Sequence, residues 1–182
     1  MTLEDDDPDT FTYFVHWLYY QHLPDKNKND DKELTEKFYH DKYPGYEEIV
    51  RLCVFADKYE TTGPRRATVD LLFHTMVNHE DSGLPGNDTI TYAFKHLSAT
   101  SPMRRLLVDL FCHYESLEGF DRHVLTNLVF LQAMWQRYVH SRCNEDQDIA
   151  EGLKLCDCHE HTNEGDRKAC EKNRNGKGEG SG

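Results

Sequence analysis

The spacing of the apolar residues most constrains the fold of this chain. Between Phe11 and Val139 apolar side chains recur at helical intervals, in segments that begin or end at proline, glycine or capping residues. Residues 7–23 show this best, because Asp7 is a good N-cap and Pro8 fits the first helical position. One face of this predicted helix carries Phe11, Phe14, Val15 and Leu18. The spacing predicts a mostly α-helical protein.

Five further segments show similar spacing, giving about six helices in all. They are residues 46–59, 61–76, 87–97, 101–114 and 121–140. At most one short strand is expected, at Thr2 and Leu3. Residues 24–45 are dominated by Lys, Asp, Asn and Glu without clear periodicity, so we expect a charged, solvated insertion there. Residues 143–182 are almost entirely polar and have too few apolar side chains to form a core, so we expect them to be disordered.

Charge and hydropathy exclude several functions. The formal net charge is −12, and binding of nucleic acid requires a clustered basic face, so we expect no nucleic-acid partner. No apolar run approaches the roughly 20 residues needed to span a bilayer. The first seven residues are acidic, unlike a signal peptide. We therefore expect an intracellular protein of the nucleus or cytoplasm, with Cys53 and Cys112 as buried thiols.

Several motifs, taken in order, resemble one family. The first is the acidic run from Leu3 to Phe11, followed by Trp17-Leu18-Tyr19. The second is the stretch from Leu52 to Tyr59, which contains Val-Phe-Ala-Asp-Lys-Tyr. The last two are the runs from Arg65 to Leu72 and from Ser101 to Asp109. Together they resemble the C-terminal part of a BTB/POZ domain of filamentous-fungal type, followed by the helical extension often found behind such domains. The Val-Phe-Ala-Asp-Lys-Tyr stretch is the most specific of these motifs.

The resemblance implies a division of the chain into three parts. Residues 1–79 correspond to a partial BTB/POZ-like domain, whose parent fold is α+β, with the charged insertion at residues 24–45. Residues 80–142 correspond to the helical extension, and residues 143–182 form the polar tail. The front of the family's domain, which supplies much of its sheet and dimer interface, has no counterpart here, so we do not expect homodimerisation. Thr61, Thr62 and Gly63 depart from the family pattern and are expected to weaken packing at the start of that helix.

The function implied by the resemblance is that of a non-enzymatic adaptor or scaffold. BTB-type domains bring a client protein to a partner such as a cullin-type ubiquitin ligase or a transcriptional complex. The sequence carries no phosphate-binding glycine loop, nucleophile elbow or zinc-protease motif, so we expect no enzymatic activity. With the front of the domain missing, an aromatic face should be uncovered, and the predicted interaction surface is Phe11, Phe14, Trp17, Tyr19 and Tyr20.

A cluster in the tail offers a second hypothesis, a zinc-binding regulatory protein. Thiolate and imidazole are preferred zinc ligands, and the candidate ligands are Cys156, Cys158 or His159, His161 and Cys170. Their spacing differs from the usual two-residue knuckle, and a disordered polar tail rich in Cys and His explains it as well. A BTB fragment without independent function is the third reading. The remaining histidines, including His16 and His22, are interpreted as structural, because none has a nucleophile at a catalytic spacing.

Overall fold

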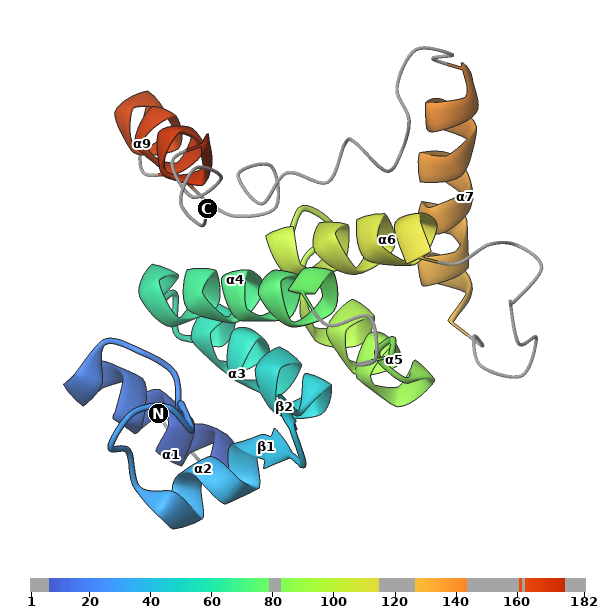
Figure 1. Ribbon diagram of the computed structural model, residues 1–182. Helices are drawn as coiled ribbons and strands as arrows, with labels where there is room; N and C mark the ends of the chain where they lie inside the picture. Colours follow the sequence, from blue (N-terminus) through green and yellow to red (C-terminus); the bar gives the residue numbers. More distant parts are fainter. Residues whose placement is uncertain (1–6, 79–82, 115–126, 144–160, 162, 176–182) are drawn as a thin grey trace.

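The computed structural model describes residues 7–78, 83–114, 127–143, 161 and 163–175 (Figure 1). Within these residues the chain is mostly helical, which confirms the predicted fold class. The elements are α1 (Pro8–Tyr20), α2 (Lys32–Phe38), β1 (Tyr39–His40), β2 (Tyr43–Pro44), α3 (Tyr46–Lys58), α4 (Thr62–Asn78), α5 (Asn87–His96), α6 (Pro102–Tyr114), α7 (Leu128–Cys143) and α9 (Glu164–Asn175). None of these helices is both long and apolar enough to cross a membrane.

Helix α1 begins as the sequence predicts and ends slightly earlier. The Asp7 carboxylate accepts a hydrogen bond from the backbone N–H of Thr10 at 2.9 Å and caps the helix. Burial raises the pKa of Asp7, but hydrogen bonds from Thr10 outweigh this effect and the pKa is lowered. The helix stops at Tyr20, because Gln21 adopts a left-handed conformation with φ of 56° before Pro24 is reached. This turn directs the chain into the loop that precedes α2.

Helix α2 and the small hairpin lie in the segment for which the sequence predicted a charged loop. Asp31 caps α2 by accepting the N–H of Leu34 at 2.8 Å. The segment buries a single large apolar side chain, Phe38, whose ring meets that of Tyr13 at 4.9 Å. β1 then pairs antiparallel with β2. Helix α2 was not predicted, because a seven-residue helix with one buried aromatic side chain has too short an apolar repeat to be recognised.

Helix α3 lies at the centre of the fold and packs against α1, α4 and α5. Cys53 is fully buried there, as expected. One buried cluster runs from α1 through α2, α3, α4, α5 and α6 to α7, so it includes residues on both sides of the boundary predicted between residues 79 and 80. Its largest fully buried side chains are Phe38, Ile49, Leu52, Leu72, Ile90, Met103, Leu106, Leu107, Leu110 and Phe130.

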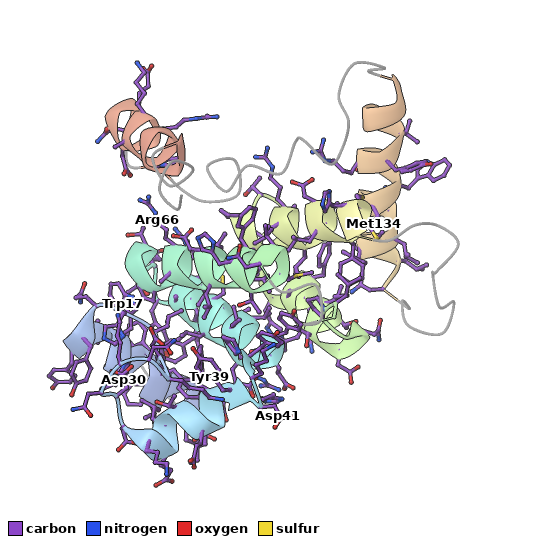
Figure 2. The ribbon with its side chains drawn as sticks, viewed as in Figure 1. Trp17, Asp30, Tyr39, Asp41, Arg66 and Met134 are labelled. Carbon is purple, nitrogen blue, oxygen red and sulfur yellow. The ribbon has the colours of Figure 1, made fainter. Side chains whose placement is uncertain are left out.

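Helix α9 lies in the tail that the sequence predicted to be disordered. It is capped by Asn163, whose side chain accepts the N–H of Asp166 at 2.9 Å. Asp166 also receives a hydrogen bond from Arg66 of α4 at 3.1 Å, and Figure 2 shows Arg66 on the side of α4 toward α9. The helix is polar, so capping and charge pairs stabilise it rather than a buried apolar face. The strand expected at Thr2 and Leu3 lies outside the described residues.

Candidate interaction surface

The five aromatic residues predicted to form an interaction surface lie on α1 in two different environments. Phe14 packs on the ring of Phe55 at 5.0 Å, and Trp17 packs against the core. Phe11 is 39% exposed with one edge against Phe55. Tyr19 and Tyr20 are the most open, at 81% and 62% exposed, and are joined at the surface by Leu18. The exposed part of this surface is therefore Phe11, Leu18, Tyr19 and Tyr20.

The pocket of Trp17 explains the unusual residues at the start of α4. A side-chain carbon placed on Gly63 would lie 2.2 Å from the Trp17 indole, so only glycine leaves room for that ring. The sequence predicted that Gly63 would weaken packing here. The contact shows the opposite effect, because the missing side chain lets an aromatic ring cover the helix start.

A larger exposed apolar surface lies on α7, which the aromatic pattern did not single out. Figure 1 shows α7 crossing the end of α6, with its later turns extending away from the neighbouring helices. One side of α7 exposes four apolar residues, and we call it the α7 outer face. It consists of Leu128 (78% exposed), Val129 (56%), Trp135 (67%) and Val139 (38%).

The opposite side of α7 is firmly packed. Phe130 is fully buried, with its ring edge-to-face against Phe94 of α5 and Phe111 of α6, both at 5.1 Å. Asn127 caps the helix by accepting the N–H of Phe130 at 3.0 Å. Met134 also packs against the core and lies beside α6 in Figure 2. The outer face is therefore carried by a helix whose position the core determines.

A basic pocket of about 500 Å³ lies between α5, α6 and α7, next to the outer face. We call it the arginine pocket; its lining includes Phe94, Arg104, Arg105, Asp109, Gln136 and Arg137. Gln136 follows Val129 by seven positions, so both lie on the border between the pocket and the outer face. The pocket therefore places positive charge directly beside an exposed apolar stripe.

The arginines of the pocket differ in their hydrogen-bond partners. Arg137 Nε donates to Asp109 at 2.5 Å. Arg104 stacks over the Phe94 ring at 4.1 Å and donates to the Leu97 carbonyl at 3.2 Å. Its buried Nε has no hydrogen-bond partner among the described residues, and burial lowers the pKa of its guanidinium. Arg104 is thus a half-buried cation in the pocket lining, where a carboxylate would meet its positive charge.

The predicted zinc ligands of the tail fall mostly beyond what the structure describes. Cys156, Cys158 and His159 lie outside the described residues, and Cys170 belongs to α9. His161 is described, with Nδ1 at 3.9 Å from the Asp166 carboxylate. The zinc hypothesis for the tail therefore stays a prediction.

Comparisons with known proteins identified no similar protein. A scan against protein-family models, a search of curated proteins and a search of solved structures each found no match. The function is therefore argued from the chain's own surfaces.

The α7 outer face left a signal in the sequence that the predicted interaction surface did not use. Leu128, Trp135 and Val139 recur at i, i+7 and i+11 around a polar Gln132, which places them on one helix face. Phe130 and Met134 form the other apolar face, but the sequence does not show which face meets the core. The arginine pocket carried no sequence signal, because its residues come from three helices and an adjoining loop.

Proposed function

We propose that this chain is a non-enzymatic protein-interaction module, an adaptor or scaffold of BTB type, that binds its partner through the α7 outer face. The observation that supports this proposal is that one side of α7 exposes an apolar stripe while the opposite side is packed into the core. Trp135 is two-thirds exposed, while Phe130 on the opposite side is fully buried. Exposed tryptophan on an ordered helix is typical of the residues that contribute most to protein interfaces.

Charge indicates the chemistry of the partner. The chain as a whole has a net charge of −12, yet the sequence of α7 contains no Asp or Glu and two arginines. The arginine pocket adds Arg104 and Arg105 beside the stripe. Opposite charges speed the encounter of two proteins and help to fix how they align at the interface. The partner we propose is therefore a protein segment that presents apolar side chains to α7 and a carboxylate to Arg104.

Site-specific photo-crosslinking in the native cell tests this proposal. A photoreactive amino acid at position 128 or 135 should yield the same crosslinked protein, whereas one at Lys95, an exposed position on α5, should not. Mass spectrometry of the product would also test the expectation of a cullin-type ubiquitin ligase or transcriptional complex. Identical products from all three positions, or none from α7, would contradict the proposal.

Variants of the purified chain then separate the two parts of the surface. With the identified partner, Trp135→Ala should weaken binding by about 2 kcal/mol or more, as at interface hot spots. Arg104→Gln should weaken binding chiefly at low salt, because screening already reduces the charge contribution at high salt. Lys95→Ala is the matched control, and equal affinities for all variants would contradict the assignment.

A further inference from the structure

Two histidines and one aspartate converge beside the end of α1. His16 lies on α1, His22 follows the helix, and Asp30 ends the loop before α2, where Figure 2 labels it. One potential metal-binding atom from each of the three lies within 4.8 Å of the others. His16 Nε2 is 3.5 Å from the Asp30 carboxylate, and His22 Nδ1 is 3.7 Å from the same oxygen.

The cluster is buried and incompletely satisfied. The side chains of His16 and Asp30 are only 4% and 5% exposed. His16 Nε2 has no hydrogen-bond partner among the described residues, and it lies 3.5 Å from the Asp30 oxygen. A buried polar atom without a partner destabilises a fold. A bound cation would satisfy His16, His22 and Asp30 together.

The geometry approaches that of a tetrahedral metal site. With metal–ligand bonds of about 2.0–2.2 Å, neighbouring ligand atoms around zinc lie about 3.3–3.6 Å apart. The 3.5 Å between His16 Nε2 and the Asp30 oxygen lies within this range. Two imidazoles and one carboxylate also form a common three-residue zinc ligand set, which leaves a fourth position for water. His22, at 26% exposed, lies on the solvent side of the cluster.

The surrounding contacts hold the three side chains in place. Asp30 accepts the N–H of Asp25 at 2.9 Å, which closes the loop on itself. His22 Nδ1 donates to the Leu23 carbonyl at 2.8 Å, an arrangement that orients many metal-binding histidines and leaves Nε2 with its lone pair. Lys26 in the same loop donates to the Asp41 carbonyl of the hairpin turn.

We propose that His16, His22 and Asp30 form a binding site for one divalent zinc ion that joins the end of α1 to the loop before α2. This site is separate from the Cys/His cluster of the tail and from the α7 outer face.

Zinc titration of the full-length chain by calorimetry tests the site. The triple variant Cys156→Ser, Cys158→Ser and Cys170→Ser removes the three thiols predicted to bind zinc in the tail. We expect this variant to bind one equivalent of zinc, and the further change His22→Gln to weaken binding at least about tenfold. His74→Gln, on an exposed histidine of α4, is the matched control and should leave zinc binding unchanged.

Two results would overturn the proposal. One is the absence of zinc binding in the triple tail variant, and the other is unchanged affinity after His22→Gln. Because His22 is partly exposed, that variant should keep its helical circular dichroism, which separates loss of the site from loss of the fold. Nuclear magnetic resonance provides an independent readout: zinc should shift the ring-nitrogen signals of His16 and His22, and a titration that shifts neither would also overturn the assignment.

Discussion

The contact between Gly63 and Trp17 shows how one missing side chain determines local packing. We predict that Gly63→Ala lowers the free energy of unfolding by about 1–3 kcal/mol, because the new methyl group would displace the indole. Chemical denaturation of the two proteins measures this difference. In a Trp17→Ala background the same change should be neutral or slightly stabilising, since alanine favours helix over glycine by up to about 1 kcal/mol. Equal effects in both backgrounds would show that the indole contact is not the cause.

Cys112 provides a second prediction at the residue scale, through its ionisation. Burial, aided by the Asp109 carboxylate, raises the pKa of its thiol from 9.0 to about 11. Between these two values the folded state holds a proton that the unfolded state has lost, so stability should fall as pH rises through this range. Denaturation from pH 8 to pH 11 measures the slope, which Cys112→Ala should reduce. An unchanged slope would show that other groups cause the dependence.

Helix α7 allows the packed and exposed sides of one element to be compared directly. Phe130→Ala should lower the free energy of unfolding by about 3–5 kcal/mol, because it empties the space between Phe94 and Phe111. Leu128→Ala should change stability by less than about 0.5 kcal/mol, since that side chain is 78% exposed. Thermal and urea denaturation check both values. A large loss for Leu128→Ala would mean that the outer face is packed in the isolated chain, and the binding proposal would lose its support.

The sequence predicted the long helices well and the short or polar ones poorly. Residues 46–59 and 87–97 were predicted almost to the residue, because several apolar side chains at helical spacing must share one buried face. Helices α2 and α9 depend on caps at Asp31 and Asn163 and on few apolar contacts, so periodicity could not reveal them.

Both candidate sites depend on which residues meet in space. His16 and His22 are six positions apart, which would place them on different faces of a continuous helix. The left-handed turn at Gln21 and the loop that returns Asp30 bring the three groups together. The arginine pocket depends likewise on how α5, α6 and α7 pack. Chain reversals and helix packing set these contacts, and neither leaves a periodic signal in the sequence.

At the scale of the whole molecule, the buried cluster bears on how the chain should be divided. The resemblance to BTB/POZ domains places a boundary between residues 79 and 80, but the cluster passes from Tyr13 on α1 through α3 to Phe130 on α7. Elements that share one core usually unfold together. We therefore predict a single cooperative transition for residues on both sides of that boundary.

The two tryptophans make this prediction measurable. The sequence contains only Trp17 and Trp135, so Trp135→Phe leaves Trp17 as the sole tryptophan reporter, on the α1 side of the core. Its fluorescence and the helical circular dichroism, which α3 to α7 dominate, should then change at the same urea concentration. If Trp17 fluorescence changed at clearly lower urea, α1 and α2 would form a separate, weaker unit. The shared core would then not make the chain one cooperative unit.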